Sequence, residues 1–167
     1  MDLRTTRTIR SAIEIRAPLD VVWRVLTDFD AYPAWNPHVR RVIGKPRVGG
    51  RLAIHTRPPG GRTVVMRPII LEWTPPRELR WRATFVSPRM FSGEHGFSLE
   101  ELGPSRVRFS QDETFSGLMV PLYAQLRLAS TRLGFAQMNE ALRTRAESEA
   151  AGGQAAAPAT TSVGAPS

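Results

Sequence analysis

"FSGEHGFSLEELGPSRVRFSQDETF", residues 91–115, alternates apolar and polar side chains on both sides of a "GPS" turn. Such alternation is typical of half-buried strands, so the stretch predicts two antiparallel strands joined by a short turn. One face of the first strand carries Phe91, Gly93, His95, Phe97 and Leu99. The matching face of the second strand carries Val107, Phe109, Gln111, Glu113 and Phe115. We therefore expect this mainly apolar face to be buried, with a histidine, a glutamine and a glutamate on it.

The three polar residues of this face are expected to lie close together. With the turn near residues 102–105, pairing brings His95 opposite a residue close to Gln111 or Glu113. A neighbouring carboxylate would raise the pKa of the imidazole, whereas apolar burial would lower it. Three roles stay open: a buried network in which the three side chains satisfy one another, hydrogen bonding to a ligand, and acid–base catalysis by His95 and Glu113. The last role suits proton transfer beside a carbonyl, as in aldol cyclisation or dehydration.

The flanking sequence predicts the elements around this pair of strands. Residues 9–15 alternate as a strand, and "APLDVVWRVLTDF", residues 17–29, has helical spacing after Pro18. "DAYPAWNPHV", residues 30–39, is a proline-punctuated corner, and four strand signals follow up to residue 86, the last three parted by "PPGG" and "TPP". Short turns favour antiparallel pairing, and a twisted sheet can curl around a helix. Where sheet and helix separate, we expect an internal cavity.

"PLYAQLRLASTRLGFAQMNEALRTRA", residues 121–146, predicts a long helix with two apolar sides. The first apolar stripe consists of Leu122, Leu126, Ala129, Leu133 and Ala136. The second consists of Leu128, Phe135, Met138 and Leu142. A helix that is apolar on two sides is expected to be enclosed. The folded domain is expected over residues 5–146, and the Ala-, Gly-, Pro-, Ser- and Thr-rich residues 147–167 are expected to form a flexible tail.

The composition excludes several classes of protein. The chain has 167 residues with 41% hydrophobic and 23% charged, which suits one globular domain. It has no cysteine, which excludes disulfides, thiol nucleophiles and cysteine metal sites. The sequence predicts a cytoplasmic protein because it shows neither a secretory signal nor an apolar run long enough to span a bilayer.

The net charge of +8 comes almost entirely from arginine. The arginines are spread along the chain and accompany no nucleic-acid-binding motif. We therefore expect no specific nucleic-acid partner and a weak attraction to anionic surfaces. The sequence carries no signal of an oligomeric state.

In several segments the chain resembles the START-like, or SRPBCC, superfamily and, within it, the polyketide cyclase/dehydrase-like branch. The segments that carry the resemblance are "IRAPLDVVWRVLTDFDAYPAWNPHV" (15–39), "GGRLAI" (49–54), "ILEWTPPRELRW" (70–81), "SGEHGFSLEEL" (92–102) and "FSQDETFSGLMVP" (109–121). The resemblance covers about residues 8–146. It implies an α+β helix-grip fold, in which a curved antiparallel sheet of about seven strands wraps around a long C-terminal helix and two short helices follow the first strand. It supplies no family-wide catalytic motif, because the superfamily includes aromatase/cyclases, lipid carriers and hormone receptors.

The cavity that this fold implies is expected to have a mainly apolar wall. The wall also carries His95, Gln111 and Glu113, which we call the polar trio. The predicted ligand contacts are Trp35, Leu52, Ile54, Met66, Trp81, Phe85, His95, Phe97, Phe109, Gln111, Glu113, Leu133 and Met138. His38 and His55 are expected at the surface. The sequence shows no pattern of metal ligands, no phosphate loop and no serine-hydrolase elbow, so no metal or cofactor is expected.

Three functions are consistent with these observations. The first is binding of a small apolar or aromatic ligand, polyketide-like or lipid-like, inside the cavity. The second is a cyclase or dehydratase that uses His95 and Glu113 as acid and base. The third is an interaction protein whose interior is filled by its own side chains.

Overall fold

The computed structural model describes residues 5–155. Its elements follow in the order β1 (Thr5–Ile15), α1 (Leu19–Thr27), the 3-10 helix η1 (Phe29–Ala31), α2 (Tyr32–Trp35), β2 (Val39–Ile43), β3 (Ala53–Thr56), β4 (Val64–Met66), β5 (Ile69–Thr74), β6 (Glu78–Phe85), β7 (Phe91–Gly103), β8 (Arg106–Gly117) and α3 (Val120–Ala155). None of the helices in this part of the chain combines the length and apolarity needed to cross a membrane.

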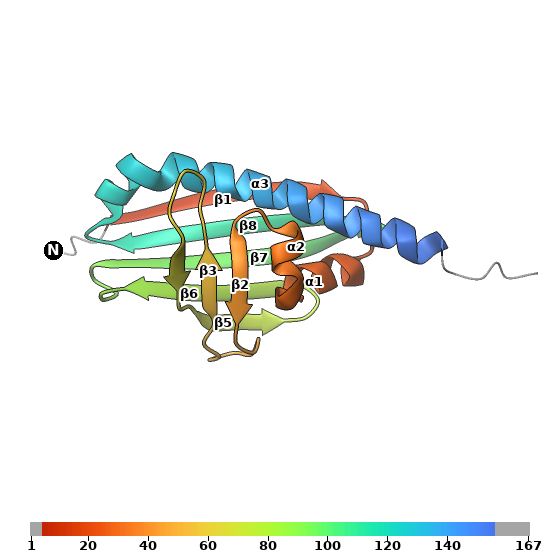
Figure 1. The fold of residues 1–167 in the computed structure, drawn as a ribbon, viewed down its shortest axis with the longest axis horizontal. Coiled ribbons are helices and arrows are strands. Elements are labelled where there is room, and N and C mark those ends of the chain that lie inside the picture. The colour runs from red at the N-terminus through yellow and green to blue at the C-terminus, as the bar shows by residue number, and fades with distance from the viewer. Residues whose placement is uncertain (1–4, 156–167) are drawn as a thin grey trace, which may run out of the picture.

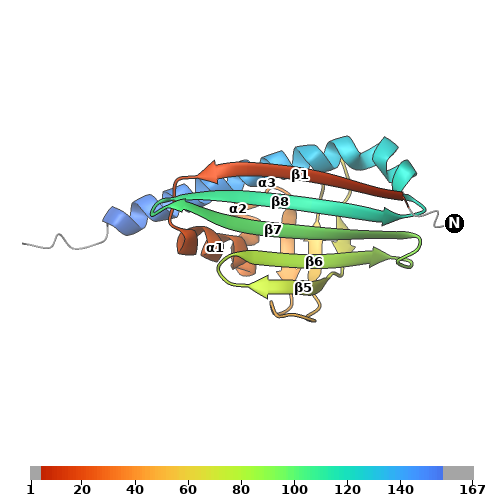
Figure 2. The same ribbon diagram turned by 180° about the vertical axis from the view of Figure 1, so that it is seen from behind.

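The strands form two antiparallel sheets. The larger has the order β1-β8-β7-β6-β5 and the smaller has the order β2-β3-β4 (Figures 1 and 2). The α+β helix-grip fold is confirmed, with eight strands where the sequence indicated about seven. The additional strand arises because Arg67 and Pro68 divide one apolar run into β4 and β5. Proline has no N–H to donate to a sheet ladder, so it interrupts the pairing there.

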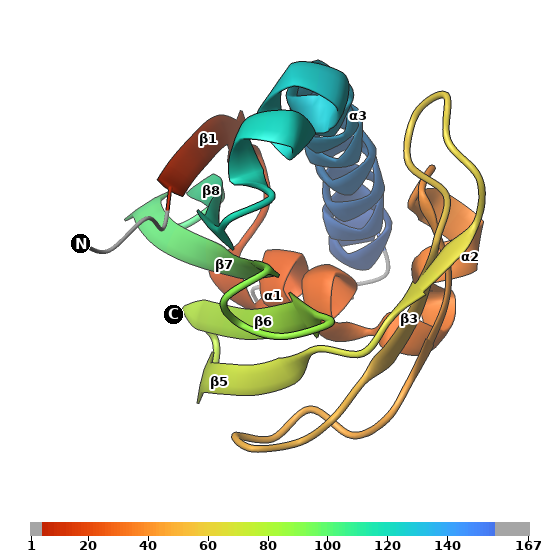
Figure 3. The same cartoon turned by 90° about the vertical axis from the view of Figure 1, so that its left-hand side faces the viewer.

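Helix α3 lies on the concave side of the large sheet, and the small sheet stands across from it (Figure 3). Two apolar clusters hold α3 at different points along its length. In its first half, Val120 and Phe135 pack with Ile9 and Phe115. Towards its C-terminal end, a larger cluster joins its buried residues to α1, to α2 and to both sheets. The polar trio of β7 and β8 lies between these clusters.

Only one of the two apolar sides of α3 is covered by the described residues. Phe135 and Leu142 are buried, whereas Leu122, Leu126 and Leu133 are 47%, 65% and 51% exposed. The expectation that the helix is enclosed on both sides is therefore wrong. The sheet curls beneath α3 but no described element passes over its outer side (Figure 3).

Helix α3 also continues beyond residue 146, where the sequence was expected to become a flexible tail. Residues 147–155 are helical, and Ala150 is buried. A side-chain oxygen of Glu147 accepts a hydrogen bond from the backbone N–H of Arg16 at 2.8 Å, and Glu149 forms an ion pair with Arg24 at 3.2 Å. Alanine and glutamate are strong helix formers, which favours this extension. The remaining predicted tail, residues 156–167, lies outside the described residues.

Candidate functional site

A cavity of about 540 Å³ lies between α3, the concave face of the large sheet and the small sheet. Its floor on β6 and β7 is formed partly by two very small residues, Ala83 and Gly93, which are paired across the strands. Larger side chains at these positions would occupy the space. The wall is mainly aliphatic and aromatic, which suits an apolar ligand.

Nine of the thirteen predicted ligand contacts lie on the cavity wall: Ile54, Met66, Trp81, Phe85, His95, Phe97, Gln111, Glu113 and Met138. Most of them come from strands whose alternation could be read from the sequence. Strand parity therefore identified most of the wall on the large sheet.

The other four predicted contacts lie elsewhere. Leu52 and Phe109 are buried in the core, at 2% and 0% exposure, where neighbouring side chains cover them. Leu133 points to the outer side of α3. Trp35 packs against Tyr32, with ring centroids 4.9 Å apart, so Tyr32 reaches the cavity while Trp35 does not.

Gln111 connects the sheet to α3 through a buried hydrogen-bond network. Its amide nitrogen donates to the carbonyl oxygen of Phe135 at 3.2 Å and to Oδ1 of Asn139 at 2.5 Å. Asn139 in turn donates to the hydroxyl of Ser11 on β1 at 2.8 Å. The network therefore fixes the orientation of the Gln111 amide, since the Phe135 carbonyl can only accept.

This orientation sets the proton position on His95. Oε1 of Gln111 lies 3.0 Å from Nε2 of His95. Because the oxygen can only accept, Nε2 must carry the proton. In the neutral ring Nδ1 is then an acceptor, and among the described residues no hydrogen bond uses it. The ring is held between Phe97 and Phe135, at centroid distances of 4.2 and 4.8 Å.

Glu113 lies directly opposite His95 in the β7–β8 register, as the turn position indicated. The two side chains nevertheless form no hydrogen bond within the described residues. A Cβ placed on Gly93 would lie 2.9 Å from Oε1 of Glu113, so the carboxyl group occupies the space that the glycine leaves. The direct acid–base contact that the sequence suggested is thus replaced by two separate polar groups on the same wall.

Both groups are held in their neutral forms near pH 7. Burial lowers the pKa of His95 to about 4, against a smaller opposing effect of its hydrogen bond with Gln111. Burial raises the pKa of Glu113 to about 8, and the nearby carboxylate of Asp112 adds to this shift. The cavity therefore presents a neutral carboxyl group that can donate and an imidazole nitrogen that can accept.

A second polar region lies where α2 meets β2, on the opposite wall. Asn36 is 2% exposed, and its side-chain oxygen accepts from the backbone N–H of His38 and of Val39. The amide nitrogen of Asn36 and Nε2 of His38 are buried without a hydrogen-bond partner in residues 5–155. Both residues line the cavity, so His38, which was expected at the surface, is partly exposed and also reaches the cavity wall. His55 on β3 is likewise partly exposed but lies off the wall.

The β3–β4 connection, residues 57–63, lies beside α3 (Figures 1 and 3), and three of its residues, Pro58, Pro59 and Arg62, line the cavity. The hydroxyl of Ser130 donates to the carbonyl oxygen of Pro59 at 2.7 Å. A Cβ on Gly134 would lie 3.4 Å from the ring of Pro59, so the two segments touch closely. Sequence reasoning missed the contact of Pro59 because irregular loops have no periodicity, and the "PPGG" motif signalled only a turn.

The open end of the cavity is marked by the lining residues that are exposed to solvent. These are Arg62 and Val64, from the β3–β4 hairpin, and Phe85, at the end of β6. Arg127 of α3 lines the cavity nearby and approaches Gly61. The entrance therefore lies between the β3–β4 hairpin, the end of β6 and the first half of α3.

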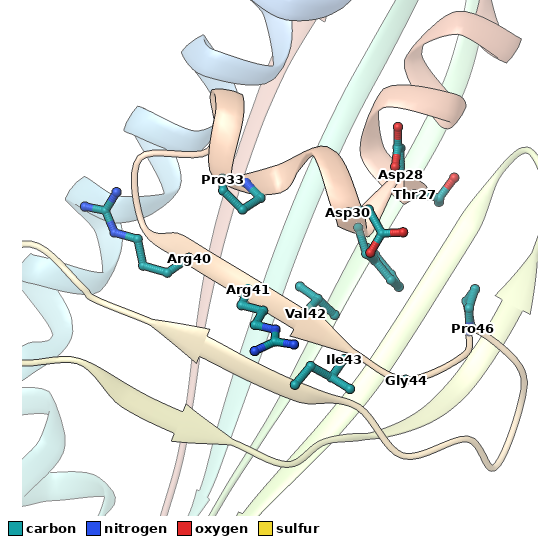
Figure 4. A pocket seen from close by; sticks show the side chains of 11 residues that line it. Thr27, Asp28, Asp30, Pro33, Arg40, Arg41, Val42, Ile43, Gly44 and Pro46 are labelled. Carbon is teal, nitrogen blue, oxygen red and sulfur yellow. The ribbon is translucent and has the colours of Figure 1, made fainter.

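A second hollow, of about 630 Å³, lies between β2 and the turn after α1 (Figure 4). Asp28, Asp30, Arg40 and Arg41 line it, and all four are exposed. Their solvent exposure and opposite charges are typical of ordinary surface. Among residues 5–155, His, Asp and Glu side chains form no group of three or more that could hold a metal ion.

Comparison with solved structures places this geometry among known folds. The Zhui aromatase/cyclase from Streptomyces sp. R1128 is 17% identical, with 86% of this chain and 94% of that chain covered and a TM-score of 0.72. A START superfamily protein from Mycobacterium smegmatis is 19% identical, with coverage of 85% and 98% and a TM-score of 0.68. Norcoclaurine synthase from Thalictrum flavum is 12% identical, with coverage of 87% and 97% and a TM-score of 0.67. At such identities the likeness shows the fold alone.

The sequence gives the more specific assignment. No curated protein matches the chain significantly. The sequence profile of a family described as "Polyketide cyclase / dehydrase and lipid transport" matches residues 6–147, which is most of the chain. The START-like resemblance noted in the sequence is confirmed, and the chain belongs to the polyketide cyclase/dehydrase and lipid transport family.

Proposed function

We propose that this protein binds one small, mainly apolar or aromatic ligand, polyketide-like or lipid-like, inside the cavity. The observation that carries the proposal is a cavity of about 540 Å³ with an apolar wall and two neutral polar groups on it. Pockets for small organic ligands usually measure about 300–1,000 Å³. The alternative of an interior filled by its own side chains is at odds with this volume.

The polar groups indicate which ligand atoms would be recognised. A carbonyl oxygen of the ligand would accept the proton of the Glu113 carboxyl group, and a hydroxyl would donate to Nδ1 of His95. At the opposite wall, the amide of Asn36 and Nε2 of His38 would pair with a second polar group. The ligand class is thus an apolar body with oxygen functions at both ends, because buried polar atoms are stabilised by partners.

Acid–base catalysis is a second candidate, favoured by the separation of the two pKa values. Environments that push two titratable groups apart in pKa are typical of an acid and a base in one site. In a dehydration, Nδ1 of His95 would take a proton from the carbon beside a ligand carbonyl. Glu113 would protonate the departing hydroxyl, which leaves as water. Return of the proton from the imidazolium to the carboxylate would restore both groups.

Ligand binding is tested by blocking the cavity. Ala83→Phe places a ring on the floor, whereas Ala129→Phe makes the same change on the exposed side of α3. We expect the first to weaken binding of the neutral dye Nile red by about tenfold, which corresponds to about 1.4 kcal/mol, and the second to leave it unchanged. Thermal melting confirms that both variants are folded. Equal dye binding by both variants would contradict the proposal.

The two candidate functions are separated by His95→Gln, measured with a ligand that co-purifies from the natural host and is identified by native mass spectrometry. If the protein only binds, the variant should weaken affinity modestly, since glutamine keeps a hydrogen-bonding group. If it catalyses, turnover should be lost while binding is retained. A wild-type protein that returns this ligand chemically unchanged supports the binding function.

A further inference from the structure

The entrance end of the molecule exposes a cluster of apolar side chains, which we call the apolar rim: Phe85, Val86, Leu118, Met119, Leu122 and Leu126. They are 41%, 98%, 50%, 39%, 47% and 65% exposed, respectively. Backbone hydrogen bonds from Leu118 to Arg89 and from Met119 to Met90, each 3.0 Å long, tie the β6–β7 turn to the start of α3. The segments that carry the rim therefore lie side by side, at the end of the molecule that faces the viewer in Figure 3.

Val86, at the tip of this surface, has an unusual backbone. Its φ of 65° lies in the left-handed region, which is costly for a β-branched residue. A residue that is both strained and almost fully exposed contributes little to packing. Strained positions of this kind are often found at functional sites, so the valine is better explained by an external contact than by the stability of the domain.

The charged residues of the segments that form the entrance all have one sign. The three segments that form the entrance, residues 53–68, 83–93 and 116–137, contain six arginines and no lysine, aspartate or glutamate. Among them, Arg62 and Arg89 are exposed and Arg127 is partly exposed beside the entrance. Glu113, the acidic residue on the cavity wall, is held neutral by its raised pKa. An apolar surface with arginines on the same segments is complementary to a negatively charged surface with an apolar interior.

We propose that this end of the molecule docks on an anionic lipid bilayer. The apolar rim enters the boundary between headgroups and acyl chains, and the arginines contact the lipid phosphates. A bilayer fits better than an acidic protein, because the most exposed rim residue projects from a turn and the entrance opens beside it. An apolar ligand could then pass between bilayer and cavity without crossing water. This inference is independent of which ligand the cavity holds.

The test is co-sedimentation of the full chain with vesicles of phosphatidylcholine alone, or of phosphatidylcholine mixed with phosphatidylglycerol. We expect binding to be at least about tenfold tighter with the anionic lipid, and to weaken as salt rises. The double variant Val86→Asn, Leu118→Asn should lose about tenfold in affinity. Asparagine tolerates the left-handed region better than valine, so this variant should fold at least as well at position 86. Val48→Asn is the matched control, since Val48 is 61% exposed on the β2–β3 connection, away from the rim.

Three results would overturn the inference. The first is no binding to either kind of vesicle, including the case in which the protein instead captures an acidic protein. The second is equal binding to vesicles with and without phosphatidylglycerol. The third is an equal loss of binding in the Val48→Asn control. A further pair of variants, Arg62→Gln and Arg89→Gln, should weaken binding to anionic vesicles only, and unchanged binding by both would also contradict the proposal.

Discussion

His95 and Glu113 are register partners on β7 and β8, yet their side chains turn away from each other. The imidazole bonds to Gln111, and the carboxyl group lies over Gly93. Because the imidazole and the carboxyl group do not pair with each other, each leaves a polar atom available to a ligand. This separation makes the pair suitable for contacting two different oxygens of one ligand.

Glu113→Gln tests whether the carboxyl group is neutral. Its pKa of about 8 in the fold lies above the ordinary 4.5, so the folded protein holds a proton that the unfolded chain releases. The stability due to this proton is fully present below pH 4.5 and is lost as the pH rises towards 8. We expect wild type to lose on the order of 3 kcal/mol relative to Glu113→Gln across this window. Urea unfolding at a series of pH values measures the difference, and parallel curves for the two proteins would contradict the prediction.

Gln111→Leu removes the amide that joins His95 to α3. We expect a loss of about 1–3 kcal/mol in the free energy of unfolding, because the Phe135 carbonyl and Asn139 lose a partner. The imidazole should also lose its fixed tautomer, which nitrogen-15 NMR of the ring detects. Gln125→Leu is the matched control, since Gln125 is exposed on α3. A ring that keeps its proton on Nε2 in Gln111→Leu would show that Gln111 does not orient it.

Gly93→Ala tests the space that Glu113 occupies. The new methyl group would lie 2.9 Å from the carboxyl oxygen and should displace the side chain into the cavity. We expect dye affinity to fall about fivefold, equivalent to about 1 kcal/mol. Gly103→Ala, on the same strand, meets no atom within 4 Å and should leave affinity unchanged. The same affinity in both variants would show that the carboxyl group lies elsewhere.

Ala150→Asp tests the part of α3 beyond residue 146. Ala150 is 9% exposed and packs in the larger core cluster, so a buried carboxylate there should cost about 1–3 kcal/mol. Ala151 is exposed on the same turn, and Ala151→Asp should change stability by less than about 0.5 kcal/mol. Chemical unfolding of the two variants makes the comparison. Equal stabilities would mean that this part of the helix contributes nothing to the core.

The sequence could predict the fold and the large-sheet side of the cavity because strand parity is a local property. Alternation placed His95, Gln111 and Glu113 on one face, and the turn length placed the first opposite the last. It could not predict side-chain direction within that face. The turn of the carboxyl group over Gly93 depends on which neighbours leave space, and this is fixed only when three strands are assembled.

The sequence also could not show which helix faces are covered by another element of the fold. The stripe containing Leu126 and Leu133 has the same periodicity as a buried one, and whether another element covers it is decided by tertiary structure. Likewise His38 and Ser130 belong to segments far apart in the chain, and neither carries a periodic signal that would place it at the cavity. The rim and the contact of the β3–β4 connection with α3 were therefore found only in the structure.

The contact between Ser130 and Pro59 has a kinetic consequence. A single neutral hydrogen bond contributes about 1 kcal/mol, far less than the free energy that holds a domain together. The β3–β4 connection can therefore leave α3 and return many times while both core clusters remain intact. Loop motions of this kind take nanoseconds to microseconds, whereas global unfolding is much slower. Under the proposed binding function, a guest molecule therefore leaves without unfolding of the domain, and the lifetime of the guest and the lifetime of the fold can be tuned separately.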